Sequence, residues 1–201
     1  MAAVSLLESL LTTPSARIAA IQTAREFCSQ KPIFLDTETT GLDSNAEIVE
    51  IVVLDSDGST LMNSLVHPRS PIPPESSRIH GITDEMIQNA PAWISLWQEL
   101  RGIFFGRLLA IYNAEFDLRM IDQTNRKSGL IRWKPGLPPA DIMRIFADYR
   151  SVWDPSRNAN RFFRLEEAGR FFGIEIPNSH RALDDTLLAR EVLYKIADSS
   201  L

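Results

Sequence analysis

Short apolar runs separated by turn-forming residues dominate the first third of the chain. Residues 32–35, Pro-Ile-Phe-Leu, form a run too short for a helix and predict a buried strand. Residues 47–55 predict a second strand, and an Asp-Gly pair predicts the hairpin turn into a third strand at residues 59–67. The proline-rich residues 68–74 predict an extended loop.

The remaining pattern is mostly helical. Thr13 and Pro14 are typical of a helix start, Thr83 of a helix cap, and Gly129 and Gly173 of helix ends. We expect helices at residues 13–28, 84–88, 91–105, 114–128, 141–149, 163–172 and 181–197, a fourth strand at 107–112 and a polar loop at 151–160. Three consecutive strands followed by alternating strands and helices predict an α/β fold, with helices on the faces of a mixed sheet.

Two acids follow the apolar run of the first predicted strand. Side chains alternate between the two faces of a strand, so Asp36 and Glu38 point the same way, about 7 Å apart. Two carboxylates aimed together from a buried strand repel each other and lose hydration, and a cation between them relieves both costs. A strand end that runs into solvent would also explain the pair, so the rest of the chain has to decide.

Two further acids belong to the apolar faces of predicted helices. Asp117 lies in the first turn of its helix, in line with buried positions, although a surface acid matched to the helix dipole would look the same. In the last helix, Asp185 continues into the apolar stripe, whereas its neighbour Asp184 continues into the polar side. His180 precedes this helix on a loop that can reach the same site.

Four carboxylates converging in one cleft would be tolerable if divalent cations neutralised them. Oxygen ligands without cysteine favour Mg²⁺ or Mn²⁺ over Zn²⁺. Two such ions can stabilise the attacking and the leaving oxygens of a phosphodiester, and a nearby histidine can accept the proton of the attacking water. The pattern therefore predicts hydrolysis of a phosphodiester.

The charge of the chain is unevenly distributed. The net charge of −5 combines 7 basic and 15 acidic residues at 1–118, 12 and 7 at 119–181, and 2 and 4 at 182–201. In the basic block, Trp133, Tyr149, Trp153, Phe162 and Phe163 fall among Arg144, Arg150, Arg157, Arg161 and Arg164. Interleaved basic and aromatic groups suit a nucleic-acid strand with unstacked bases, but an arginine-rich surface over core aromatics is equally consistent.

Composition indicates one globular domain with a full core, or such a domain with a short helical appendage, because the 201 residues are 44% hydrophobic. The single cysteine, Cys28, cannot form an internal disulfide. No apolar stretch approaches the roughly 20 residues that span a bilayer, and residues 1–11 lack the pattern of a secretion signal. We therefore expect a cytoplasmic protein.

Several short motifs occur in a specific order. Residues 36–42 read Asp-Thr-Glu-Thr-Thr-Gly-Leu, residues 79–83 Ile-His-Gly-Ile-Thr, residues 113–117 Asn-x-x-Phe-Asp and residues 180–185 His-x-Ala-x-x-Asp. This ordered set resembles the DnaQ-like (DEDDh) 3′→5′ exonuclease family over residues 32–197. The resemblance implies a ribonuclease H-like α/β fold, a mixed five-stranded sheet with helices on both faces. It divides the chain into an N-terminal helical extension, residues 1–30, and an exonuclease domain, residues 31–201.

The resemblance also implies the roles of the catalytic residues. Asp36, Glu38 and Asp185 would hold the first divalent cation, and Asp36 would bridge to a second one supported by Asp117. His180 would be the general base. The terminal nucleotide would be held by the backbone near Glu38 and by substrate-binding residues. The implied substrate-binding residues are Thr37, Leu42, Ile79, His80, Asn113 and Phe116.

Leu42 is expected to act as an apolar wedge against the last base, although a plain turn or core leucine would fit the same position. The implied reaction releases nucleoside 5′-monophosphates from the 3′-hydroxyl end of a single strand, with DNA favoured. An RNA-trimming or oligoribonucleotide-degrading exonuclease and a proofreading subunit within a polymerase complex remain open alternatives. A polymerase or a second copy of the chain would be the protein partner in such cases, and no membrane partner is expected.

Overall fold

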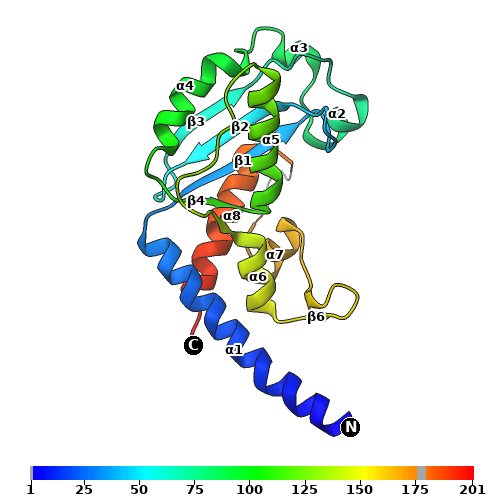
Figure 1. The fold of residues 1–201 in the computed structure, drawn as a ribbon, viewed down its shortest axis with the longest axis vertical. Coiled ribbons are helices and arrows are strands. Elements are labelled where there is room, and N and C mark those ends of the chain that lie inside the picture. The colour runs from blue at the N-terminus through cyan, green and yellow to red at the C-terminus, as the bar shows by residue number, and fades with distance from the viewer. Residues whose placement is uncertain (1, 176–179) are drawn as a thin grey trace.

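A five-stranded mixed sheet forms the centre of the computed structural model, which describes residues 2–175 and 180–201, the side chains of residues 2–15 excepted (Figure 1). The strand order is β3-β2-β1-β4-β5. The pairs β1–β2 and β2–β3 are antiparallel, and the pairs β1–β4 and β4–β5 are parallel. The strands are β1 (Ile33–Thr39), β2 (Ile48–Leu54), β3 (Thr60–Leu65), β4 (Leu109–Ile111) and β5 (Ala140–Asp141). The expected α/β fold is confirmed.

Helices cover both faces of the sheet. One face packs against α1, α6 and α8, and the other against α4 and α5. The helices are α1 (Ala2–Ser29), α2 (Pro74–His80), α3 (Asp84–Ile87), α4 (Trp93–Phe104), α5 (Ala114–Lys127), α6 (Ile142–Arg150), α7 (Leu165–Phe172) and α8 (Ala182–Ala197). No helix in the described ranges is both long and apolar enough to cross a membrane.

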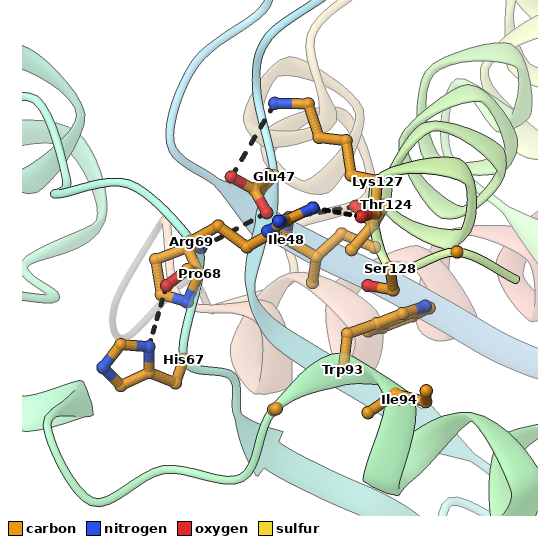
Figure 2. Close-up of a pocket in the computed structure, with 12 residues that line it drawn as sticks. Glu47, Ile48, His67, Pro68, Arg69, Trp93, Ile94, Thr124, Lys127 and Ser128 are labelled. Carbon is orange, nitrogen blue, oxygen red and sulfur yellow. Dashed lines mark hydrogen bonds and ion pairs between the residues drawn. The ribbon is translucent and has the colours of Figure 1, made fainter.

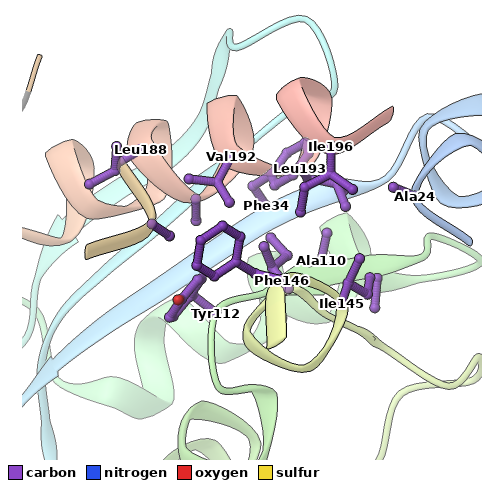
Figure 3. Close-up of a cluster of buried hydrophobic side chains, with 14 of the residues drawn as sticks. Ala24, Phe34, Ala110, Tyr112, Ile145, Phe146, Leu188, Val192, Leu193 and Ile196 are labelled. Carbon is purple, nitrogen blue, oxygen red and sulfur yellow. The ribbon is translucent and has the colours of Figure 1, made fainter. Parts of the chain in front are cut away.

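Alternation along the strands divides the core between these two layers. Phe34 points to the α1, α6 and α8 side, where Figure 3 shows it beside Val192 and Phe146. Its neighbours Ile33 and Leu35 point to the α4 and α5 side. Truncating the fully buried Phe34 to alanine would cost about 3–5 kcal/mol. Since apolar residues fill the middle of β1, the acids that follow them are carried rigidly to the edge of the core.

The first helix differs from the expectation that it starts at Thr13. It begins at Ala2, so Pro14 lies inside the helix and not at its first position. The preceding residues are rich in alanine and leucine, which are strong helix formers and outweigh the start signal of Thr-Pro. The second half of α1 contributes Ile21 and Ala24 to the core that includes α6 and α8.

Other differences concern short elements. The sequence did not predict α2, which begins at Pro74, the last residue of the expected loop. Gly81, with φ 73°, is the C-cap of this helix. The two-residue strand β5 was expected only through the family resemblance. Within the expected polar loop, β6 (Trp153–Asp154) and β7 (Ala159–Asn160) pair as a small hairpin.

Candidate active site

Three of the predicted carboxylates come together where β1 passes the first turn of α8. Asp36, Glu38 and Asp185 each offer a carboxylate oxygen, and these oxygens all lie within 4.8 Å of one another. Strand periodicity places the first two on the same side of β1, as the sequence predicts. The first turn of α8 supplies the third, while Asp184 lies outside the group.

Asp117 lies next to this group in the first turn of α5 and is only 2% exposed. The hydroxyl of Thr37 donates a hydrogen bond to its Oδ1 at 2.7 Å. Its charge is close enough to raise the pKa values of Asp36 and Glu38. Asp117 is thus oriented by a residue of β1 that sits between the two acids of the group.

The pKa values of all four carboxylates are raised, as expected for a group of acids without enough neighbouring positive charge. Burial, followed by the neighbouring carboxylates, raises the pKa of Asp36 well above its usual range and that of Glu38 to about 8. Burial also raises the pKa of Asp117 to about 7 and that of Asp185 to about 6. Closely spaced oxygen donors of this kind fit hard divalent cations such as Mg²⁺ or Mn²⁺.

A fifth acid, Glu50, adjoins the group and was missed by the sequence reasoning. It pairs with Glu38 across the β1–β2 ladder and is 3% exposed. Its Oε1 and Oε2 accept hydrogen bonds from Nη2 and Nε of Arg181 at 2.8 and 3.3 Å, and Oε2 also accepts from the backbone N–H of Ala182 at 3.1 Å. A single acid in an otherwise apolar strand was the signal that could have found it.

His180 stands at the rim of the site in a left-handed conformation, with φ 69°. Its backbone N–H donates to Oδ2 of Asp185 at 3.1 Å. Its ring approaches α7, where Nε2 lies 3.6 Å from Oε1 of Glu166. The ring is about half exposed. The backbone of His180 is therefore fixed to the carboxylate group, while its ring is on the surface.

A hollow of about 770 Å³ opens beside the carboxylates. Thr37, Leu42, Ile79, His80 and Phe116 line it, whereas Asn113 is not among its lining residues. Leu42 and Ile79 are 75% and 59% exposed, which excludes the alternative that Leu42 is a core residue.

His80 is the buried member of this lining, at 3% exposure. Its Nδ1 accepts a hydrogen bond from the backbone N–H of Ile82 at 3.0 Å, so the neutral ring carries its proton on Nε2. Burial lowers the pKa of His80, which keeps the ring neutral. The lining of the hollow therefore includes a neutral, buried imidazole beside the exposed apolar side chains of Leu42 and Ile79.

Asn113, which was expected to bind the substrate, does not line the hollow. It is the exposed N-cap residue immediately before α5, with φ 67°.

A second hollow, of about 430 Å³, shares the lining residue Lys127 with the first and is drawn in Figure 2. Its buried acid, Glu47, is already paired with Lys127 at 3.7 Å and accepts from the backbone N–H of Arg69 at 3.3 Å. A carboxylate with fixed partners on both sides holds the loop after β3 against α5. We therefore interpret the contacts in this hollow as structural and not as part of the candidate active site.

The basic and aromatic block separates into two groups. Tyr149 and Phe163 are buried in the core, and Trp133 packs against Trp97 and Phe104. For these residues the alternative of core aromatics holds. Trp153, by contrast, is 58% exposed.

Comparisons with known proteins agree with this geometry. The RNase_T family model, described as an exonuclease, matches residues 33–193. The chain is 37% identical to the uncharacterized exonuclease CP81 of Escherichia phage 186, covering 88% of this chain and 93% of that protein. It is 29% identical to the DNA polymerase III subunit epsilon of Treponema pallidum, covering 78% of this chain and 72% of that protein.

Solved structures of nucleases share the fold, as one example shows. The nuclease domain of 3'hExo, a DEDDh family member bound to rAMP, superposes with a TM-score of 0.69 and covers 85% of this chain and 93% of its own. At 15% sequence identity, this likeness concerns the fold alone.

Proposed function

This chain belongs to the exonuclease family, and we propose that it removes nucleotides from the 3′-hydroxyl end of a single nucleic-acid strand, with DNA favoured. One observation carries the proposal: the three carboxylates within 4.8 Å of one another stand beside a hollow large enough for a nucleotide. The products would be nucleoside 5′-monophosphates.

Two divalent cations, Mg²⁺ or Mn²⁺, are the proposed cofactors. Asp36, Glu38 and Asp185 would hold one cation, and Asp36 with Asp117 would hold the other. When bound, such ions offset the negative charge of the phosphate and make a water molecule more acidic. This role is consistent with the raised pKa values of the carboxylates, because a bound cation stabilises the ionised form of each carboxylate and so favours loss of its proton.

The chain's own residues would orient the parts of the reaction. Leu42 and Phe116 would flank the terminal base, since both line the hollow, Leu42 from the segment after β1 and Phe116 from α5. His180 would accept the proton of the attacking water on its ring. The hydrogen bond from its backbone N–H to Asp185 supports this role, because it keeps His180 beside the carboxylates.

A proofreading role is the second candidate. The observation that favours it is the 29% identity to a DNA polymerase III epsilon subunit over most of both chains. In that case the natural partner would be a polymerase and the substrate a mispaired 3′ end. Degradation of short RNA is the alternative substrate class, because the family motifs do not specify how the 2′-hydroxyl is met.

The division into a helical extension, residues 1–30, and a catalytic domain, residues 31–201, is likewise proposed. The family match beginning at residue 33 supports it. Since Ile21 and Ala24 of α1 belong to the core, we propose that this extension stabilises α6 and α8 in addition to any partner role. A chain with one unpaired cysteine and these relatives is proposed to work in the cytoplasm.

The test is a time course on single strands labelled at either the 3′ or the 5′ end, with DNA and RNA in parallel. We expect immediate loss of the 3′ label, stepwise shortening of the 5′-labelled strand, and dependence on Mg²⁺ or Mn²⁺. Unchanged cleavage in excess chelator, or loss of the 5′ label first, would contradict the proposal.

A further inference from the structure

We propose that a surface formed by the exposed side chains of Arg144, Trp153 and Arg157 around the half-buried ring of Phe162 binds the single strand upstream of its 3′-terminal nucleotide. This inference rests on the proposed function and extends it to the substrate's path and length. We call these four residues the basic–aromatic surface. They come from the start of α6, from the β6–β7 hairpin and its loop, and from the segment that leads into α7.

The composition of this surface is suited to a nucleic-acid strand. The guanidinium carbons of Arg157 and Arg144 lie 4.3 and 5.6 Å from the ring centroid of Phe162. Trp153 is 58% exposed on a two-residue strand. Exposed rings can stack with unpaired bases of any sequence, and neighbouring guanidinium groups can bind the phosphates between them.

The four residues differ from the other basic and aromatic residues of the same block. Arg150 lies 4.2 Å from the ring centroid of Phe171 and 5.0 Å from that of Phe163, so it covers the edge of the core. Arg161 is paired with Glu167 at 3.3 Å. The surface available for a ligand therefore includes fewer of the basic and aromatic residues than the sequence suggested.

Arg144 stays exposed although it contacts two acids. Its side chain is 60% exposed, and it lies 3.3 Å from Asp141, whose side chain is 14% exposed, and 3.8 Å from Glu115, whose side chain is 81% exposed. The exposed pair with Glu115 contributes little free energy, so a phosphate can replace that acid.

Three contacts place the segments that carry this surface next to the segments that carry the candidate active site. The hydroxyl of Tyr112 donates to the carbonyl of Phe163 at 2.9 Å, one residue from Phe162. Glu166 lies 3.6 Å from the ring of His180. Glu115, which contacts Arg144, is two residues from Asp117.

The nucleotide hollow and this surface lie on opposite sides of the carboxylates. The hollow extends from Phe116 towards α2. In Figure 1, α2 lies above the first turn of α5, and α6, α7 and β6 lie below it. A strand with its last nucleotide in the hollow and its reacting phosphate at the carboxylates therefore continues towards α6, α7 and β6. The block of residues 119–181, with 12 basic and 7 acidic residues, is the basic part of an otherwise acidic chain.

The experiment compares a dinucleotide with 5-mer and 20-mer single strands, using the full chain and Mg²⁺. The variants are Phe162→Ala, Trp153→Ala and Arg157→Gln, and the matched control is Arg101→Gln, an exposed arginine of α4 on the opposite layer. For the 20-mer we expect KM to rise between about 5- and 100-fold for each aromatic variant, with kcat unchanged. We expect the dinucleotide kinetics to stay at the wild-type value.

Salt dependence supplies an independent measurement. Binding of a labelled 20-mer in chelator, followed by fluorescence anisotropy, should weaken in the variants, and Arg157→Gln should reduce the slope of log Kd against log salt by about 0.7. Equal losses on the dinucleotide and the 20-mer, or unchanged 20-mer binding in all three variants, would overturn the proposal. A surface for an acidic protein would give the second result. Wild-type protein that binds the 20-mer through this surface but cleaves no strand would contradict the proposed function alone.

Discussion

Glu38 and Glu50 face each other across the β1–β2 ladder, yet their surroundings are opposite. Glu50 is held by the guanidinium group of Arg181 and by the backbone N–H of Ala182. Glu38 instead faces the carboxylates of Asp185 and of Glu50 itself, and with burial they raise its pKa to about 8. Two identical side chains on neighbouring strands therefore have different electrostatic surroundings.

The partners of a buried acid distinguish one that belongs to the scaffold from one proposed to hold a cation. A buried carboxylate with fixed cationic and N–H partners is already satisfied by the fold. A carboxylate surrounded by its own kind is satisfied only if positive charge arrives from solution. Because Arg181 and Ala182 begin α8, the structural acid also fixes the helix that presents Asp185 to the functional group.

The largest effect is expected for Glu38→Gln. Removing a proposed cation ligand forfeits several kcal/mol of transition-state stabilisation, so kcat should fall by about a thousandfold or more. The same change removes a carboxylate from a repulsive group, so the free energy of unfolding measured in chelator should rise. Steady-state kinetics on a labelled strand and urea unfolding check the two parts.

The two adjacent acids of α8 provide a control for this prediction. Asp185→Asn should behave like Glu38→Gln, whereas Asp184→Asn, one residue away and outside the carboxylate group, should keep wild-type kcat. If both asparagine variants lost activity equally, the assignment of Asp185 as the functional acid would be wrong.

His180→Ala is expected to have the next largest effect. A positioned general base contributes about 10²- to 10⁴-fold, so kcat should fall by that factor. The affinity for Mn²⁺, measured by calorimetry, should be unchanged, because the backbone N–H that contacts Asp185 is retained in alanine. A loss of Mn²⁺ binding equal to that of Asp185→Asn would show that His180 acts through the carboxylates.

Sequence periodicity could predict those parts of the site that lie on regular elements. The strand period places Asp36 with Glu38, and the helix period separates Asp185 from Asp184, because both choices depend only on backbone geometry. Glu50 escaped because its importance comes from Arg181, which is 131 residues away in the chain. No local pattern contains such a contact.

The remaining errors have a similar cause. The short α2 follows a proline-rich loop, where local signals favour extended chain, and β5 has only two residues. The Thr13-Pro14 start signal was outweighed by the helix formers before it. The direction of the His180 ring depends on Glu166 in another helix, so it could not be deduced from spacing.

Glu50→Gln is the matched partner of Glu38→Gln and should have the opposite effect on stability. Replacing hydrogen bonds to a charged group by neutral ones should lower the free energy of unfolding by about 1–2 kcal/mol. A less firmly held start of α8 should reduce kcat about tenfold with KM for the strand unchanged. If Glu50→Gln abolished activity while stabilising the chelated protein, Glu50 would belong with the functional acids.

The smallest expected effect is a pH dependence of stability that distinguishes Glu38 from Glu50. Without cations, the raised pKa values of Glu38 and Asp117, about 8 and about 7, mean that the folded protein binds protons that the unfolded chain has already lost above pH 4–5. Stability should therefore be greatest near pH 5 and fall as pH rises towards 8.

Water in the open cleft weakens this pH effect, so we expect a loss on the order of 1–2 kcal/mol, or about 3–6 °C in Tm, across that range. Saturating Mg²⁺ should reduce the slope, because the cation stabilises the ionised carboxylates. Glu38→Gln should also reduce the slope, and Glu50→Gln should reduce it less, because Glu50 is only one of the charges that raise the pKa of Glu38 and the Glu38 and Asp117 carboxyls still titrate in that variant. Calorimetric scans from pH 5 to 8 decide this, and equal slopes in the two glutamine variants would mean that the paired and unpaired acids are electrostatically alike.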